Sequence, residues 1–351
     1  MKFGDVELYN VVELVEPEVG AGKFFTRVPN ELRLTLNESA RERALCTAGS
    51  EIRFNLESGS VKVVLQFEGE AWGFVELYQG PFQVSTHEIG PTAKEVVIEH
   101  SANSASIEVL VQIAQERKAP FDARLTRVLL PHWPQIRLLD ICTDGARITS
   151  PRGGQTPQLC YLAYGSSITH GLSATRPTGG YAMRTAQLLG VELINLGFGG
   201  GARCEPQMAD YIAQRTDWDF ATLELGVNML YGFEVEDFSR RVRYFVERIA
   251  RANVSKWIFC IDIFTLGYDL IERYDCYNMG VPPNQDKFRQ VVRSAAAELG
   301  LPNLIHIDGR EIFNDPFGLT ADLVHPAPSG MELMAQNLTA IIRPYLHKTP
   351  K

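Results

Sequence analysis

Two hydrophobic patterns divide the chain near residue 150. Before that point, apolar and polar residues alternate over short stretches such as EIRFNL (51–56), VKVVLQF (61–67) and ASIEVLVQI (105–113). A period of two over five to nine residues predicts half-buried β-strands. Turn-prone pieces such as LESGS and YQGPF separate these stretches. We therefore expect an all-β sandwich domain, jelly-roll-like, over residues 1–150.

After the Gly- and Pro-rich stretch 149–158, apolar runs of strand length alternate with segments of helix length. The runs are 159–165, 191–198, 220–227, 257–264 and 303–308, and the helix-length segments are 180–189, 205–216, 235–252, 284–299 and 330–346. This alternation predicts an α/β domain over residues 151–351, with a five-stranded parallel sheet covered on both faces. Gly190 and Gly300 fall where helices are expected to end. SGME (329–332) has the capping-box pattern of a helix start.

Charge and composition narrow the range of partners. The chain has 42 acidic and 34 basic residues and a formal net charge of −8. We therefore expect no nucleic-acid and no anionic-membrane partner, because both require clustered positive charge. The first 17 residues carry acidic side chains through their apolar stretch, which does not fit a signal peptide. No apolar run reaches the 18 residues of a membrane span.

The six cysteines are scattered and form no CxxC pair. Two of them, Cys160 and Cys260, lie inside apolar runs, so we expect buried free thiols and a cytoplasmic protein. The spacing of the acidic residues does not resemble a metal site. Nothing in the sequence calls for a cofactor.

Groups able to perform acyl transfer follow the expected strands. Ser166 and Ser167 come after the first strand, a Gly-rich stretch after the second, Asn228 after the third, and Asp322 and His325 after the fifth. Ligands bind at the carboxyl ends of strands in such sheets. Acyl transfer through a hydroxyl needs a base, a carboxylate to orient that base, and donors for the oxyanion. The sequence supplies each of these at a separate strand end.

The blocks YGSSIT, NLGFGG, ELGVN and DLVH, in that order, resemble the four blocks of the SGNH (GDSL-type) hydrolase superfamily. The resemblance covers about residues 159 to 346 and implies a flavodoxin-like three-layer α/β/α sandwich. By this resemblance Ser167 is the nucleophile, His325 the general base, and Asp322 the carboxylate that orients it. The Ser167 N–H, the Gly200 N–H and the Asn228 side chain would form the oxyanion hole.

Two positions depart from the family pattern. Ser166 stands where the family usually has Asp, and Met229 stands where an Asp often follows the Asn. We expect the first change to alter the hydrogen bonds around the serine turn and the second to reshape the pocket. A β-sandwich ahead of such a domain is also similar to certain two-domain carbohydrate esterases and to a small group of acyltransferases.

Simpler interpretations stay open for several residues. Ser166 and Ser167 also fit a plain turn with a helix cap. We expect His170 to line the pocket or cap a helix rather than act as the base. We expect Asp262 and His306 to form structural hydrogen bonds. Trp72 and Trp133 are candidates for sugar contact, although buried or interface aromatic residues are more common.

Three functions fit these observations. The first is a serine esterase that hydrolyses a small acyl ester, acetyl or another short acyl group, on a carbohydrate or small molecule. The second is an acyltransferase that moves the acyl group to a sugar or natural-product hydroxyl. The third is an inactive carbohydrate-binding protein. Pocket size depends on loops such as 171–180 and 265–283, and the oligomeric state, including a homo-oligomer, is left open.

Overall fold

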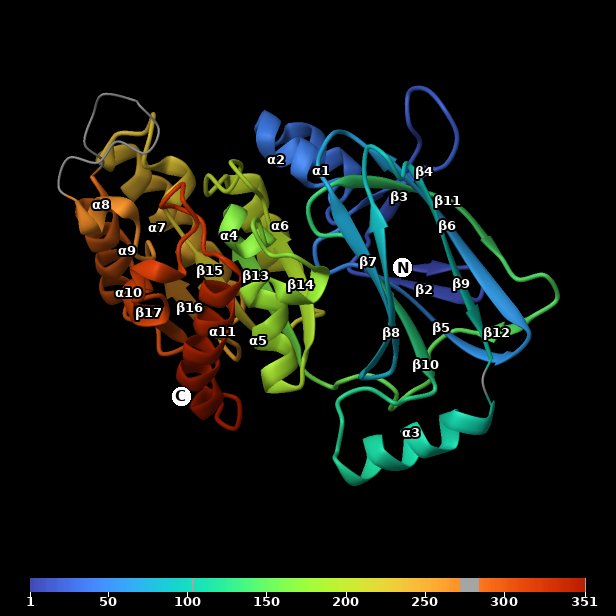
Figure 1. The fold of residues 1–351 in the computed structure, drawn as a ribbon. Helices are drawn as coiled ribbons and strands as arrows, with labels where there is room; N and C mark the ends of the chain where they lie inside the picture. Colours follow the sequence, from blue (N-terminus) through green and yellow to red (C-terminus); the bar gives the residue numbers. More distant parts are fainter. Residues whose placement is uncertain (103, 272–283, 351) are drawn as a thin grey trace.

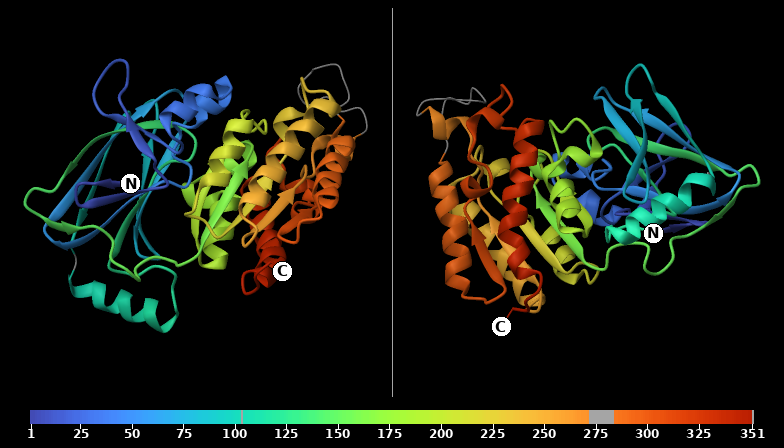
Figure 2. Two further views of the ribbon diagram at one scale, coloured as in Figure 1. Left: turned by 180° about the vertical axis from the view of Figure 1, so that it is seen from behind. Right: turned by 60° about the horizontal axis from the view of Figure 1, so that its bottom comes forward.

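The computed structural model describes residues 1–102, 104–271 and 284–350, which form two regions side by side (Figure 1). Most of loop 265–283, including Cys276, lies outside the described residues. The first region consists of two antiparallel sheets, and the second of a parallel sheet with helices on its two faces (Figure 2). Thr149 is the last residue in the antiparallel sheets and Cys160 the first in the parallel sheet, so we keep the proposed boundary after residue 150.

The two antiparallel sheets have orders β1-β2-β5-β10-β7-β8, with β12 also paired to β5, and β3-β4-β11-β6-β9. The strands of the first sheet are β1 Lys2–Phe3, β2 Val6–Tyr9, β5 Glu51–Ser58, β7 Gly73–Gln79, β8 Phe82–Ile89, β10 Leu125–Leu129 and β12 Arg147–Thr149. Those of the second are β3 Glu13–Val15, β4 Lys23–Thr26, β6 Ser60–Glu68, β9 Glu95–Ser101 and β11 Gln135–Cys142.

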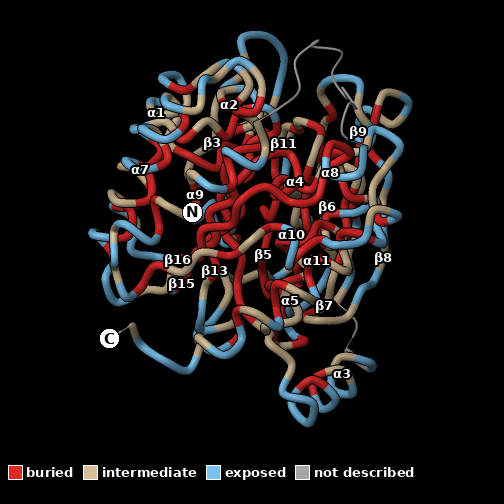
Figure 3. The backbone as a smooth tube through the Cα atoms, turned by 90° about the vertical axis from the view of Figure 1, so that its left-hand side faces the viewer, coloured by how far each residue is buried: buried red, intermediate tan, exposed pale blue. Residues whose placement is uncertain are grey.

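The sandwich core lies between these two sheets. Buried segments run through the middle of the molecule, and exposed segments lie around them (Figure 3). Strand β6 shows the predicted alternation, because Val61, Val63, Leu65 and Phe67 are all buried while the residues between them are half-buried. Ile52 and Phe54 of β5 face the same core from the other sheet. Packing of alternate residues from two facing sheets is what a β-sandwich requires.

The strand predicted over residues 105–113 is wrong, because this segment belongs to helix α3, Ser104–Glu116. Val111 and Ala114 are buried, whereas Val109 and Ile113 are largely exposed. The apolar residues Ile107, Val111 and Ala114 also follow helical spacing, i, i+4 and i+7. Two periodicities therefore coexist in this segment, and packing on the sandwich edge selects the helical one.

Strand β5 was expected to be half-buried, but its polar face is buried as well, at the contact with the second region. Arg53 donates to both carboxylate oxygens of Glu192 at 2.7 and 2.8 Å, and to Glu51 at 2.8 Å. Arg127 also donates to Glu51. Although burial opposes ionisation, the two arginines hold the pKa of Glu51 at about 2. The alternating polar residues of β5 thus form a charge-balanced contact between the two regions.

The second region has a parallel five-stranded sheet of order β14-β13-β15-β16-β17. Its strands are β13 Cys160–Gly165, β14 Glu192–Gly197, β15 Phe220–Glu224, β16 Trp257–Ile261 and β17 Leu304–Ile307. Helices α5 Tyr181–Leu189 and α11 Pro328–Ile342 cover one face, and α6 Pro206–Gln214, α7 Val235–Ala252 and α9 Gln285–Leu299 cover the other. This confirms the predicted flavodoxin-like α/β/α domain after an antiparallel β domain.

The helix ends follow the sequence only in part. Gly190 and Gly300 end α5 and α9 in the left-handed conformation, as expected. The capping box predicted at residues 329–332 is wrong, because α11 begins at Pro328 without a side-chain cap, and Glu332 pairs with Arg184 instead. The shorter helices of this region are α4 Ser167–His170, α8 Gly267–Leu270 and α10 Gly309–Ile312. Within the described part of the chain, every helix is too short or too polar to cross a lipid bilayer.

Two short helices of the first region, α1 Asn30–Thr35 and α2 Glu38–Arg43, reach onto the second region (Figure 1). Leu36, Ala40 and Ala44 join the hydrophobic core beneath α6 and α7. The Asn37 side chain donates to the Gly201 carbonyl at 2.9 Å. This part of the first region therefore packs directly on the loop after β14, at the carboxyl edge of the parallel sheet.

Candidate active site

The serine turn lies at the end of β13, between the loops that follow β14 and β15. Helix α4 begins at Ser167, and the Ser166 side chain accepts the Ile168 N–H at 3.2 Å as its cap. A Cβ on Gly165 would lie 2.3 Å from Thr169 Oγ1 and 2.4 Å from Glu224 Oε2, so only glycine fits there. The turn thus holds Ser167 at the point where the strand order reverses, the usual ligand site of this fold.

Ser167, His325 and Asp322 lie together in one hydrogen-bonded chain. Ser167 Oγ is 2.7 Å from His325 Nε2, and His325 Nδ1 is 2.7 Å from Asp322 Oδ2. The serine and the histidine are 158 residues apart in the sequence. Such a chain can remove the hydroxyl proton as the oxygen attacks a carbonyl carbon.

The surroundings of Asp322 favour its ionised form. Partial burial alone would raise its pKa, but hydrogen bonds from the His325 and Val324 amides, the His325 ring and the Thr320 hydroxyl outweigh burial. The pKa of Asp322 is thereby lowered to about 2. The carboxylate is therefore charged at neutral pH and can hold the imidazole with Nδ1 protonated and Nε2 facing Ser167.

The glycine loop after β14 lies against Ser167. A Cβ on Gly199 would be 3.4 Å from the Ser167 Cβ, and Gly200 adopts a positive φ of 72°. Asn228 Oδ1 accepts the Ala202 N–H at 3.2 Å, which ties the asparagine to this loop. That contact leaves Nδ2 of Asn228 as the group able to donate to a ligand. The structure therefore brings the loop of Gly200, Asn228 and Ser167 to one edge of the sheet.

The buried Glu224 beneath the serine turn was missed by the sequence reasoning. Its Oε2 accepts the Ser166 N–H at 2.5 Å and the Thr169 hydroxyl at 3.1 Å. Burial raises its pKa, and the hydrogen bonds from Ser166 and Thr169 act in the opposite direction. An acidic residue inside the apolar run FATLELGV was the available signal. Ser166, where the family usually has Asp, avoids a second carboxyl group beside this one.

Other candidate residues lie outside the hydrogen-bonded chain. His170 is fully buried, with Nε2 bound to the His132 carbonyl at 2.6 Å and Nδ1 accepting the Gly199 N–H at 3.4 Å. Asp262 and His306 bond to each other at 2.8 Å. Met229 is buried in the hydrophobic core. None of these four side chains hydrogen-bonds Ser167 in the part of the chain that is described.

The first region supplies an aromatic side chain next to the glycine loop. A Cβ on Gly199 would lie 2.8 Å from the Trp133 ring, and Arg43 of α2 stacks over that ring at 4.2 Å. Trp72, the other candidate for sugar contact, packs on Gly90 of the antiparallel domain and is exposed. Residues of the antiparallel domain therefore pack against the carboxyl edge of the parallel sheet, next to the glycine loop.

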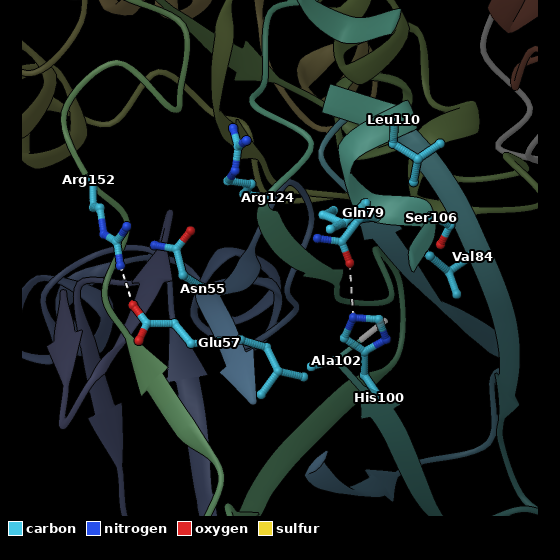
Figure 4. A pocket seen from close by; sticks show the side chains of 12 residues that line it. Asn55, Glu57, Gln79, Val84, His100, Ala102, Ser106, Leu110, Arg124 and Arg152 are labelled. Carbon is cyan, nitrogen blue, oxygen red and sulfur yellow. Dashed lines mark hydrogen bonds and ion pairs between the residues drawn. The ribbon is translucent and has the colours of Figure 1, made fainter. Parts of the chain in front are cut away.

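A separate cavity of about 320 Å³ lies within the first region, beside α3 (Figure 4). Four of its polar side chains form two pairs, Arg152 with Glu57, and His100 with Gln79 at 3.0 Å. Leu56, Val84, Ile107 and Leu110 supply the apolar part of its lining. None of the residues of the serine site contributes to this cavity.

Residues 163–333 match the model of the GDSL-like lipase/acylhydrolase family. No curated protein matches the sequence. Among solved structures, the chain is similar to the salicylyl-acyltransferase SsfX3 from a tetracycline biosynthetic pathway, with a TM-score of 0.78 and 19% identity over 98% of this chain and 96% of that one.

Two further structures share the arrangement. A putative GDSL-like lipase from Bacteroides ovatus has a TM-score of 0.67 and 18% identity, with 99% of each chain covered. A family two carbohydrate esterase from Clostridium thermocellum has a TM-score of 0.60 and 15% identity over 86% of this chain and 93% of that one. At these identities the likeness concerns the fold. The α/β part of the chain thus contains a match to the GDSL-like lipase/acylhydrolase family model, and an antiparallel β domain precedes it.

Proposed function

We propose that the protein is a serine esterase that hydrolyses small acyl esters through an acyl-enzyme intermediate. The observation that carries the proposal is the chain of two 2.7 Å contacts from Ser167 through His325 to Asp322. The match of residues 163–333 to the model of an acylhydrolase family supports the same reaction class.

In the acylation half, Ser167 Oγ attacks the ester carbonyl carbon while its proton passes to His325 Nε2. The carbonyl oxygen becomes an oxyanion, which we assign to the Ser167 N–H, the Gly200 N–H and Asn228 Nδ2. When the intermediate collapses, the carbon–oxygen bond to the alcohol breaks, and the alcohol leaves with the proton from His325. Asp322 stabilises the imidazolium in the meantime.

In the deacylation half, a water molecule attacks the acyl carbon and gives its proton to His325 Nε2. The second tetrahedral intermediate expels Ser167 Oγ, which regains the proton. The products are a carboxylic acid and an alcohol, and the enzyme returns to its starting state. Each half uses the same base and the same oxyanion donors, so one site serves both.

Loss of the hydroxyl tests the proposal directly. Ser167→Ala should lower kcat for p-nitrophenyl acetate by at least about 10³-fold, because the nucleophile is removed while the fold remains. It should also abolish labelling by a fluorophosphonate probe. Ser329→Ala, at an exposed serine on α11, is the matched control and should keep both activities. Wild-type turnover by Ser167→Ala would refute the assignment, and failure of the wild-type protein to react with any ester or probe would favour an inactive carbohydrate-binding protein.

Acyl transfer to an alcohol is the second candidate, and one observation favours it. Trp133 of the first region packs on the glycine loop, and Arg43 of α2 stacks on Trp133. We propose that this packing restricts the access of water to the acyl-enzyme. Incubation of the enzyme with an acetyl donor and a panel of sugars and phenols separates the two reactions. New esters would support transfer, whereas release of free acetate alone would leave hydrolysis as the reaction.

A further inference from the structure

Arg27, directly after β4, is a buried cation whose hydrogen bonds within the described part of the chain all go to backbone carbonyls. Its Nε donates to the Cys46 carbonyl at 2.7 Å, and one Nη donates to the Arg43 carbonyl at 2.6 Å. Toward the second region it donates to the carbonyls of Asn195 and Gly197, both at 2.9 Å. The guanidinium group therefore joins the end of α2 to the end of β14.

The charge of Arg27 lies in the interior of the protein. In the part of the chain that the structure describes, no carboxylate pairs with it, and its side chain is fully buried. Burial lowers its pKa to about 10, so the group is still protonated at neutral pH. A buried cation without a counter-ion is costly, and proteins seldom keep one without a reason.

The carbonyls that Arg27 binds lead into the glycine loop of the candidate active site. Gly197 is followed by Phe198, whose ring lies 5.0 Å from the Arg27 Cζ, and then by Gly199 and Gly200. His170, which accepts the Gly199 N–H, has its pKa lowered by burial and further by the Arg27 charge. The guanidinium thus acts on the strand end from which the loop against Ser167 starts.

We propose that Arg27 is a positioning residue for acyl transfer, supplied by the antiparallel domain, which fixes the glycine loop for binding of the oxyanion. The inference rests on the proposed esterase function and adds to it that the site is incomplete without the first domain. A planar fork with fixed N–H directions can hold four carbonyls from two domains at once, which an ammonium group cannot do. Its positive charge near the loop also favours the negative charge that develops on the substrate oxygen.

Arg27→Lys tests the inference, because lysine keeps the positive charge but lacks the planar guanidinium group. Arg27→Lys should lower kcat for p-nitrophenyl acetate by about 10- to 100-fold, because small displacements of catalytic groups have effects of this size. KM should change by less than about threefold, since the loop is expected to act on the transition state more than on substrate binding. The rate of fluorophosphonate labelling should fall with kcat, while the final stoichiometry stays at one label per chain.

The control is Arg53→Lys, which alters the other buried arginine that binds β14 from the first domain. It should lower the melting temperature but leave kcat of the folded protein within about twofold of wild type, because it acts at the far end of the strand. Arg27→Met removes the charge together with the planar group and should lower kcat at least as much as Arg27→Lys. If Arg27→Met does not fold, the comparison of Arg27→Lys with Arg53→Lys decides. A folded Arg27→Lys protein with wild-type kcat would overturn the inference. Full turnover by Ser167→Ala would instead overturn the proposed function, so the two failures are distinguishable.

Discussion

The antiparallel domain holds β14 at its two ends in different ways. At the amino end, Arg53 forms a bidentate ion pair with Glu192, inside a network that Glu51 and Arg127 complete. At the carboxyl end, Arg27 binds neutral carbonyls and has no counter-ion among the described residues. The amino end, where the charges balance, is suited to hold the two domains together; we call it the balanced end. The unbalanced end lies next to the candidate active site, where a positive charge has a use in the reaction.

The largest predicted effect separates stability from activity at the balanced end. Glu192→Leu leaves Arg53 buried without its bidentate partner, and we expect the free energy of unfolding to fall by about 3–5 kcal/mol. Urea titration measures this change. Since Glu192 lies far along β14 from the glycine loop, kcat of the folded protein should stay within about twofold.

Glu298→Leu is the matched control, because it removes a carboxylate that pairs with Arg243 at an exposed site. The stability change there should stay below about 1 kcal/mol. A parallel loss of kcat and stability in Glu192→Leu would contradict the distinction between the two ends.

Acid should weaken the two ends in sequence. Burial lowers the pKa of His132, next to the site, to about 4, below its unfolded value of 6.5. The unfolded chain then binds a proton that the folded chain does not, so stability falls as the pH drops from 6.5 to 4, by about 3 kcal/mol. At the amino end of β14, the pKa of Glu51 is about 2 in the folded protein and 4.5 in the unfolded chain, so the stability that this carboxylate contributes is lost between pH 4.5 and 2.

Urea midpoints at pH 7, 5.5 and 4 measure the first loss. His132→Gln should reduce the slope between pH 6.5 and 4, because the glutamine does not titrate, and the buried His170, whose pKa is also lowered, accounts for the rest. His306→Gln is the control, since His306 is partly exposed and lies across the sheet. An unchanged slope in His132→Gln would show that the acid sensitivity arises elsewhere.

A smaller effect is expected where α2 meets the glycine loop. A Cβ on Gly201 would lie 2.5 Å from the Ala40 amide nitrogen, so Gly201→Ala must push the loop and α2 apart. We expect a loss of about 1–3 kcal/mol in stability and, in contrast to Glu192→Leu, a fall in kcat. Gly153→Ala, where a Cβ meets open space, is the control. Wild-type kcat in Gly201→Ala would show that the loop tolerates this displacement.

The sequence predicted most of the α/β domain because each strand there is an apolar run and each helix an amphipathic stripe of ordinary length. The residues of the candidate site could be predicted for the same reason, since Ser167, Asn228 and His325 each follow a strand or lie near the last helix. The helix α3 was missed because residues 105–113 carry two apolar periodicities at once. The buried polar face of β5 was missed because its partner, Glu192, belongs to the other domain.

The role of Arg27 and the contact of Trp133 with the glycine loop could not be predicted from the sequence for a related reason. Arg27 binds carbonyls of the main chain that lie up to 170 residues away. Every residue has a main-chain carbonyl, so the sequence does not indicate which of them bind Arg27. Trp133 contacts a glycine, which has no side chain to signal the contact. Contacts between domains that use backbone atoms can be found only when the fold is known.

The position of β14 in the sheet has a further consequence. It is an edge strand, and among the described residues β13 is its one strand partner. The carbonyls of Asn195 and Gly197 on its outer side accept hydrogen bonds from Asn10 and Arg27. An unprotected outer strand invites pairing with a strand of another molecule, which leads to aggregation. The antiparallel domain therefore also shields this edge strand. A fragment that starts after residue 150 would expose the unpaired backbone groups of β14, and we expect it to aggregate.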